Sequence, residues 1–387
     1  MAKYFKCFTD KNPISYSLGD EIVFTIFARE DGKDIKCEKV VWEIQADDGG
    51  NIKGTTKITE ESPLIVKYTL KRAGFAHLIC KALDENDKEI EGFDPLDASA
   101  GVNVLDLVYS DTVPADFKEY WTDIEKMVAD FETEVLYLKE NQGREGFKSY
   151  DVRVKTPSGR PASGYVTIPL KDGKFPIRIS FQGYGLHAAS YVYEEDKICA
   201  CFNAHGFEND SWDQIEKKYG KELSGYGFNN EENASNMTTY FRNMMIRNLI
   251  GLKYLKTLPE WNGKDIISVG GSQGALQAIT VAVHDSDVTE VITDRPWFCD
   301  LNSSNAGYLK GWRPDFAEGL RYFDTVAQGM HLECPITIIC HLGDYCCPPK
   351  TVMALYNSIK SEKKIKFVQS ARHSYFPPEN EDVSADF

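Results

Sequence analysis

The sequence predicts a chain of two parts, an all-β sandwich followed by an α/β unit with a mostly parallel sheet and helices on both faces. Strand-like runs separated by turns fill residues 1–105, and an amphipathic helical pattern begins near residue 113. From residue 150 onward, short apolar runs alternate with helix-like segments, the pattern of a covered parallel sheet. We therefore expect two domains, residues 1–107 and residues 108–387.

The N-terminal part contains strand-like runs with the recurrence expected of a sandwich. The expected strands are 22–28, 39–45, 64–70 and 74–82. The turn sequences DGKD, DDGGN and DENDKE lie between them, and no helical period is visible. An immunoglobulin-like sandwich is the natural prediction, and nothing in this part indicates catalysis.

The second part opens with a helix expected over 113–127, in which Phe117, Trp121 and Ile124 recur at helical spacing. An antiparallel pair is expected at 150–154 and 164–168. The further expected strands are 176–181, 198–203, 265–269, 290–293, 335–341 and 365–369, and the expected helices are 237–257, 273–283, 323–327 and 351–358. In such sheets, ligands bind at the carboxyl ends of the strands.

Charge and composition exclude several classes of protein. The chain has 44 Lys+Arg against 59 Asp+Glu, a net charge of −15, which disfavours a nucleic-acid partner or an anionic membrane surface. No apolar run approaches the roughly 20 residues of a membrane helix. The ten cysteines lack zinc-ribbon spacing, so we expect free thiols. The N-terminus lacks a secretory pattern, which predicts a cytoplasmic protein unless a signal peptide has been removed.

A candidate nucleophile lies in the segment Gly270-Gly271-Ser272-Gln273-Gly274, a G-x-S-x-G motif. The motif alone is weak, but here a strand is expected before it and a helix after it. That context predicts a tight turn with Ser272 at its tip, and the glycines on either side remove side chains that would clash. The alternative interpretation is a glycine-rich turn with an inert serine.

A serine needs a base, and in this arrangement the partners follow in the order Ser, acid, His. His373 is the one histidine after the last expected strand, which makes it the candidate base, although a loop histidine can also be a simple surface residue. Asp344 follows the strand at 335–341 and is the favoured acid, partly on the resemblance described below. Asp294 is the competitor, and either aspartate could instead be a turn or cap residue.

Two N–H donors are needed for the oxyanion of a tetrahedral intermediate. The N–H of Gln273, directly after the nucleophile, is one candidate. The other is the N–H of Tyr184, in the loop 181–185 after an expected strand. The alternative for this loop is a tight turn without a catalytic role.

Seven segments of residues 108–387 form a recognisable set: VPADFKEYW (113–121), FQGY (181–184), YLKTLPEWNGKDI (254–266), GGSQG (270–274), RPWFCD (295–300), YFDTV (322–326) and LGDYCCPPKTVMALYN (342–357). In these segments the chain resembles the acetyl xylan esterase and cephalosporin C deacetylase family, carbohydrate esterase family 7, of α/β-hydrolase fold. The resemblance implies Ser272, Asp344 and His373 as the catalytic triad and the amides of Tyr184 and Gln273 as the oxyanion hole. It implies Pro296 as part of a small acyl pocket.

The sequence departs from the family pattern at three places. Asn203-Ala204-His205-Gly206 stands where the family usually has Arg-Gly-Gln, Ser374 replaces a usual Glu, and Cys346 occupies a pocket position that is often aliphatic. The N-terminal domain lies outside the common single-domain plan. Family members often form hexamers, so a homo-oligomer is open here, and the added domain could block or replace that assembly.

The leading hypothesis is a serine esterase that removes acetyl groups from small or oligomeric sugars, especially xylo-oligosaccharides, through an acetyl-enzyme. It needs no metal or organic cofactor; Cys346 and Cys347 near His341 are a poor ligand set, because adjacent residues rarely bind one zinc together. One alternative is a carbohydrate esterase for a larger acyl group such as feruloyl. Another is a glycan-binding protein with an inactive hydrolase domain, although Tyr4, Tyr16 and Trp42 could simply pack the sandwich.

Overall fold

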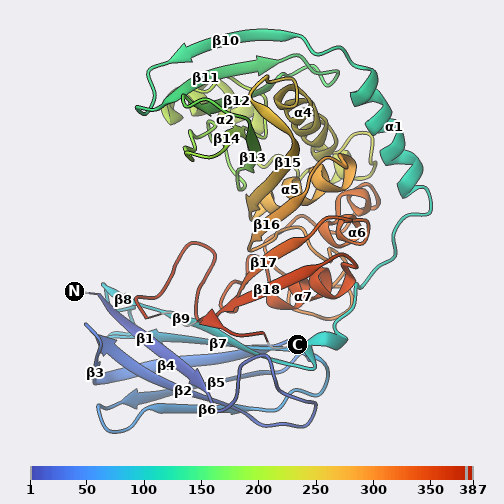
Figure 1. Cartoon of the computed structure of the whole chain (residues 1–387). Helices are drawn as coiled ribbons and strands as arrows, with labels where there is room; N and C mark the ends of the chain where they lie inside the picture. The colour runs from blue at the N-terminus through green and yellow to red at the C-terminus, as the bar shows by residue number, and fades with distance from the viewer. Residues whose placement is uncertain (1, 380–381, 386–387) are drawn as a thin grey trace.

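The computed structural model describes residues 2–379 and 382–385. Figure 1 shows an all-β region at the start of the chain and, beyond it, a large sheet lined by helices. The side of that sheet that contains β18 lies next to the all-β region, and β10 forms the opposite edge (Figure 1). The predicted architecture, a β region followed by a mostly parallel sheet with helices, is confirmed.

The N-terminal region consists of two sheets around a shared apolar core. Alternate side chains of β2 (Ile22–Glu30) are buried, as expected for a strand with one face on a core. Tyr4 and Tyr16 are both buried, so they pack the region and do not present their rings to solvent. The first sheet contains β1 (Lys3–Thr9), β2, β3 (Lys33–Ile35), β6 (Leu64–Tyr68) and β8 (Phe93–Asp94), and the second contains β4 (Cys37–Ala46), β5 (Asn51–Ile58), β7 (Gly74–Ala82) and β9 (Leu96–Val102).

The large sheet is parallel in its central part and antiparallel at its edges. Strand pairs from β14 through β18 are parallel, and the expected antiparallel pair is β11 with β12. In spatial order the strands are β10 (Val135–Asn141), β11 (Phe147–Val154), β12 (Ala162–Pro169), β14 (Ile198–Phe202), β13 (Phe175–Phe181), β15 (Trp261–Gly271), β16 (Glu290–Asp294), β17 (Ile336–His341), β18 (Lys363–Val368) and β19 (Asp382–Val383).

Four helices pack in a row, α4 on α5, α5 on α6 and α6 on α7, and α1 packs against α4. None of the helices in the described part of the chain has the length and apolar character needed to cross a membrane. The helices are α1 (Phe117–Asp130), α2 (Trp212–Leu223), α3 (Asn230–Asn233), α4 (Tyr240–Leu255), α5 (Gln273–His284), α6 (Thr325–Gly329) and α7 (Pro349–Ser358), with 3-10 turns η1 (Val104–Asp106) and η2 (Glu318–Phe323).

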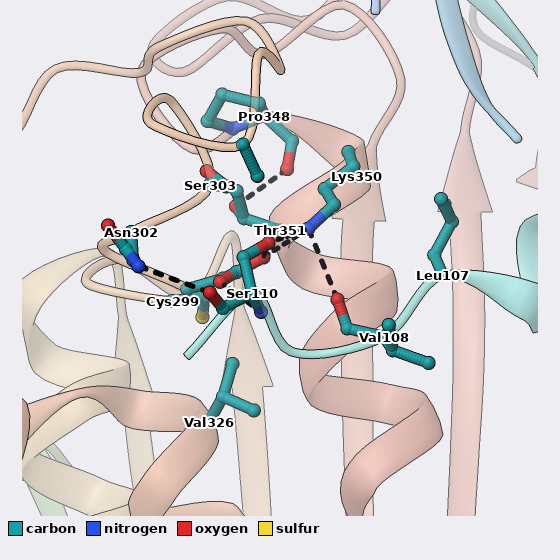
Figure 2. A network of polar contacts seen from close by, with 12 residues as sticks. Leu107, Val108, Ser110, Cys299, Asn302, Ser303, Val326, Pro348, Lys350 and Thr351 are labelled. Atoms are coloured by element: carbon teal, nitrogen blue, oxygen red, sulfur yellow. Dashed lines mark hydrogen bonds and ion pairs between the residues drawn. The ribbon is translucent and has the colours of Figure 1, made fainter. Parts of the chain in front are cut away.

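A buried lysine anchors the segment between the two regions. Figure 2 shows Lys350, in the first turn of α7, reaching back to that segment. Its Nζ donates to the carbonyl oxygen of Val108 at 3.2 Å and to Ser110 Oγ at 2.9 Å, and it pairs with the buried carboxylate of Asp300. The predicted domain boundary at 107/108 stays a prediction, but the residues just after it are fixed to the helix that follows the Asp344 loop.

Candidate active site

Ser272 stands alone between a strand and a helix. β15 ends at Gly271 and α5 begins at Gln273, so the predicted strand–turn–helix context is present. The backbone of Ser272 has φ 54° and ψ −125°, a conformation that costs a non-glycine residue free energy and is typical of functional sites. Two hydrogen bonds hold it: the Ser272 N–H donates to Asp294 O at 2.9 Å, and the Trp297 N–H donates to Ser272 O at 3.2 Å.

The glycines that flank Ser272 are required by space. A Cβ on Gly270 would lie 2.0 Å from the carbonyl oxygen of Gly274. A Cβ on Gly274 would lie 2.2 Å from the carbonyl oxygen of Phe181, at the end of β13. Both neighbours are backbone atoms, which cannot swing aside as a side chain could. The motif therefore brings the serine turn into contact with the neighbouring strand end.

The loops after β17 and β18 bring the candidate acid and base together. His373 Nδ1 lies 2.7 Å from Asp344 Oδ2. The other carboxylate oxygen of Asp344 accepts the N–H groups of Cys346 at 2.8 Å and Cys347 at 3.1 Å. The Asp344 side chain is only 1% exposed and that of His373 is 28% exposed, so the pair has one buried and one accessible end.

Ser272 and His373 are not joined by a hydrogen bond in this structure. Arg295 connects their surroundings: its guanidinium donates to the carbonyl oxygen of His373 and pairs with Asp294, which accepts the Ser272 N–H through its backbone. Catalytic hydrogen bonds are often long in ligand-free enzymes and tighten around the substrate. The structure thus places the predicted acid Asp344 and base His373 in contact. The contact between Ser272 and His373 stays a prediction.

Asp294, the competing acid, has other partners. Its carboxylate lies 2.8 Å from Arg295 Nη2 and 3.1 Å from His341 Nε2, and it does not contact His373. Burial acts to raise the pKa of Asp294, but the neighbouring His341 and Arg295 outweigh burial, and the pKa lies below its ordinary value. Asp294 is therefore held as a carboxylate by Arg295 and His341, while the His373 ring is paired with Asp344.

The candidate oxyanion donors lie on two adjoining strand ends. Tyr184 follows β13, and Gln273 is the first residue of α5, where an N–H group has no partner within the helix. Neither N–H donates a hydrogen bond to any described residue. Gly183 brings the first loop close to the nucleophile, since a Cβ there would lie 3.8 Å from Ser272 Cβ.

A polar network behind the oxyanion loop was not assigned a role from sequence. His205, after β14, is completely buried, and its Nε2 lies 2.9 Å from the Gly185 carbonyl oxygen while its Nδ1 lies 2.7 Å from the Tyr240 hydroxyl. The Gly185 N–H donates to the Tyr226 hydroxyl, which donates in turn to Gln273 Oε1, both at 3.0 Å. The sequence signal that could have found His205 is its place just after β14, at the end of the sheet where ligands bind.

Aromatic rings surround the same loop. The Tyr184 ring is stacked on Tyr226 at 4.3 Å and meets the edge of Trp312 at 4.7 Å. Trp297, whose N–H holds the nucleophile turn, lies 5.7 Å from Trp312 between ring centroids. Trp312 is 45% exposed, so this cluster offers an apolar surface to solvent beside the oxyanion loop.

Comparison with known proteins decides the family. The sequence profile described as acetyl xylan esterase (AXE1) matches residues 106–305 and 313–387, well over half of the chain. This chain belongs to the acetyl xylan esterase family. The predicted resemblance to this family is confirmed.

Among characterised relatives, the acetyl esterase Axe7A of Xylanibacter ruminicola is 26% identical over 239 residues, which are 57% of this chain and 54% of that protein. The chain thus spans about half the length of this curated relative. The solved acetyl xylan esterase of Paenibacillus sp. R4 aligns with a TM-score of 0.59 at 18% identity, over 71% of this chain and 94% of that one. Acetyl xylan esterase 1 of Thermoanaerobacterium sp. JW/SL YS485 aligns with a TM-score of 0.58 at 19% identity, over 71% of this chain and 93% of that one. These structures show the shared α/β-hydrolase fold.

The two predicted pocket residues of this family member lie on the loops that flank the site. Pro296 is buried between Arg295 and Trp297, next to the serine turn. Cys346 is half-buried, and its carbonyl oxygen accepts the Trp312 N–H at 3.1 Å. Their role as walls of an acyl pocket stays a prediction.

Asp344, Cys347 and His373 each offer a potential metal-ligand atom, and these atoms lie within 4.8 Å of one another. The Cys347 Sγ is 3.9 Å from His373 Nδ1. Burial raises the pKa of the Cys347 thiol well above its ordinary value, which keeps it protonated. The other two potential ligand atoms, His373 Nδ1 and Asp344 Oδ2, are hydrogen-bonded to each other, so the cluster fits an acid–base pair better than a metal centre. All ten cysteines are free.

Proposed function

We propose that this chain is a serine esterase that removes acetyl groups from carbohydrates, with acetylated xylo-oligosaccharides as the leading substrates. The observation that carries the proposal is the 2.7 Å contact between His373 and Asp344, formed by the loops of two strands that end near the Ser272 turn. The assignment of roles below follows from that geometry and from family membership.

In the first half-reaction, Ser272 Oγ attacks the acetyl carbonyl carbon while the His373 imidazole accepts the hydroxyl proton. Asp344 holds the ring and stabilises the imidazolium. The negative oxygen of the tetrahedral intermediate accepts the N–H groups of Tyr184 and Gln273. The bond from carbon to the sugar oxygen then breaks, and His373 returns the proton to that oxygen.

In the second half-reaction, a water molecule loses a proton to His373 and attacks the acetyl-enzyme. The new tetrahedral intermediate uses the same two N–H donors. Its collapse breaks the bond to Ser272 Oγ, which takes the proton back from His373, and acetic acid leaves and loses its proton to solvent. All groups return to their starting protonation states, so the cycle needs no cofactor.

Trp312 is our candidate for contact with the sugar. Its ring is partly exposed beside Tyr184 and Trp297, and a flat aromatic surface suits the apolar face of a pyranose. We expect Trp312→Ala to raise KM for acetylated xylo-oligosaccharides and to leave KM for p-nitrophenyl acetate nearly unchanged, because the small ester lacks a sugar.

Ser272→Ala tests the mechanism. We expect loss of nearly all turnover of p-nitrophenyl acetate and acetylated xylo-oligosaccharides, whereas Ser374→Ala, an exposed serine beside His373, should keep it. Near-normal turnover by Ser272→Ala would refute the proposal. A panel from acetyl to butyryl and feruloyl esters tests acyl size: a sharp fall beyond acetyl supports a small pocket, and a preference for feruloyl supports the larger-acyl alternative.

A further inference from the structure

The N-terminal β region lies directly against the loop that carries Asp344. The ring of Tyr345, the next residue, is stacked on the ring of His77 from β7, with 3.6 Å between centroids and 11° between planes. The Tyr345 hydroxyl lies 3.0 Å from Ser99 Oγ on β9. His77 is itself fixed, since its Nε2 lies 2.8 Å from Asp97 Oδ1.

The same strand also holds the loop that carries His373. The side-chain amide of Gln369 pairs with the backbone of Ser99: its Nε2 donates to Ser99 O at 2.9 Å, and its Oε1 accepts the Ser99 N–H at 3.3 Å. Further along this loop, the Tyr375 hydroxyl donates to Asp94 Oδ2 at 2.8 Å. Ser99 therefore contacts the acid-bearing loop through its side chain and the base-bearing loop through its backbone.

The fit leaves no free space between β9 and the acid-bearing loop. A Cβ on Gly343 would lie 2.4 Å from the carbonyl oxygen of Asp97 and 2.9 Å from that of Ala371. The Gly343 N–H donates to Ala371 O at 3.0 Å, which ties the two loops to each other. A shift of β9 would therefore move both loops.

The contacts of Tyr345 with the β region lie one residue from the proposed acid Asp344. Tyr345 lies between Asp344 and Cys346, and the Cys346 N–H holds one oxygen of the Asp344 carboxylate at 2.8 Å. A rotation of the Tyr345 backbone would move that N–H and, with it, the carboxylate that orients His373. The far end of the loop is fixed as well, because Lys350 binds Val108 and Ser110 just after the β region.

Contacts between domains of one chain are ordinarily modest and permit relative motion. Here Ser99 and His77 are buried polar residues, and Gln369 is only 6% exposed. Buried polar groups need matched partners, so they fix one register where an apolar contact could slide. Such a contact suits a surface whose task is to set geometry.

We propose that the N-terminal β region is a working part of the esterase, which holds Asp344 and His373 in register through the positioning residues His77, Ser99 and Tyr345. The proposal rests on the proposed triad. It gives a function to a region that contributes no reacting group.

The test uses the full chain and three variants. Tyr345→Phe and Ser99→Ala each remove the hydroxyl contact, and Tyr345→Phe keeps the ring that stacks on His77. Tyr68→Phe is the matched control, because its half-buried hydroxyl also donates to a side chain, Asp48 at 2.8 Å, but within the β region. We expect each of the first two variants to lower kcat for p-nitrophenyl acetate about tenfold with little change in KM, since small displacements of catalytic groups have large effects on rate.

A double-mutant cycle completes the test. Because both variants remove one shared contact, the double variant should be no slower than the slower single variant, whereas independent effects would multiply. The proposal is overturned if both single variants keep normal kcat, or if Tyr68→Phe lowers kcat as much. Melting temperatures identify variants that merely unfold; in that case Gln369→Glu, which keeps the shape of the side chain and removes the donor to Ser99, takes their place. Failure of the triad itself would appear separately, as activity in Ser272→Ala.

Discussion

His205 Nε2 lies 2.9 Å from the carbonyl oxygen of Gly185, the residue directly after the proposed oxyanion donor Tyr184. A carbonyl oxygen can only accept, so the proton of the neutral ring is on Nε2 and Nδ1 accepts from the Tyr240 hydroxyl. The imidazole thus acts as a fixed bridge between β14 and the oxyanion loop. It stands where the family usually has the arginine motif.

We expect His205→Ala to lower kcat about tenfold, because the loop that presents the Tyr184 N–H loses a support while the donor itself remains. His205→Gln, which can still donate to Gly185, should recover part of the rate. The control is His187→Ala, an exposed histidine of the same loop. Steady-state kinetics with p-nitrophenyl acetate measure the effect, and equal kcat in His205→Ala and the wild type would show that the bridge has no bearing on catalysis.

The same histidine predicts an acid-sensitive stability. Burial lowers the pKa of His205 to about 4, with smaller contributions in the same direction from Arg247, Arg160 and His187. Because an unfolded histidine titrates near 6.5, the unfolded state binds a proton between these two values that the folded state does not. The free energy of unfolding should therefore fall as pH falls from about 6.5 to about 4, by about 3 kcal/mol from this group, and should level off below.

Urea unfolding at about pH 7 and about pH 4.5 measures this dependence. In His205→Gln, which does not titrate, the loss of stability on acidification should be smaller by most of that amount. An identical loss in both proteins would mean that other groups govern the acid sensitivity.

The candidate site residues could be proposed from the sequence because their pattern is local or ordered along the chain. The motif around Ser272 needs only nearby glycines, and His373 was singled out by its place after the last expected strand. The sequence left two candidates for the acid, Asp344 and Asp294. In the structure the His373 ring contacts Asp344, whereas Asp294 contacts Arg295 and His341.

Other features depend on long-range contacts that no pattern encodes. The stacking of Tyr345 on His77 joins residues more than two hundred positions apart and became visible only in the fold. Several elements were also absent from the sequence analysis, among them α2 and β10. In α2 (Trp212–Leu223) only Ile215, Gly220 and Leu223 are buried, and most of the other positions are polar or charged, so the segment is easily mistaken for a loop. The strand β10 is an edge strand without a fully buried residue, and therefore shows no alternation.

Exchange of each aspartate for asparagine separates the two candidate acids. Asp344→Asn should lower kcat by about four orders of magnitude, as expected when the partner of a catalytic imidazole no longer fixes the tautomer or stabilises the charge. Asp294→Asn should lower it less than about tenfold, because its carboxylate serves the neighbouring ion pairs. Measured rates in the opposite order would transfer the acid role to Asp294.

Chelation tests whether the Asp344–Cys347–His373 cluster uses a metal. We expect dialysis against EDTA to leave the rate with p-nitrophenyl acetate unchanged, because the ligand atoms of Asp344 and His373 are bonded to each other and the thiol stays protonated. Elemental analysis before and after dialysis supplies the control for metal removal. Activity that disappears with the metal and returns on adding Zn²⁺ would contradict this assignment.

The Lys350–Asp300 pair should be a main determinant of stability where the β region joins the large sheet and its helices. Their side chains are 1% and 0% exposed, and Ser110 also donates to Asp300 through its N–H and hydroxyl, both at 2.9 Å. Lys350→Met leaves a buried carboxylate without its cation, which should lower the free energy of unfolding by about 3–5 kcal/mol. Lys67→Met, which breaks an exposed pair with Glu21, should lower it by less than about 1 kcal/mol.

A double variant gives a further check. Because Asp300→Asn removes the uncompensated charge, Lys350→Met combined with Asp300→Asn should lose less free energy of unfolding than the two single variants lose together. Urea unfolding of the wild type and the four variants measures these differences, and a Lys350→Met variant as stable as Lys67→Met would show that the buried pair contributes little.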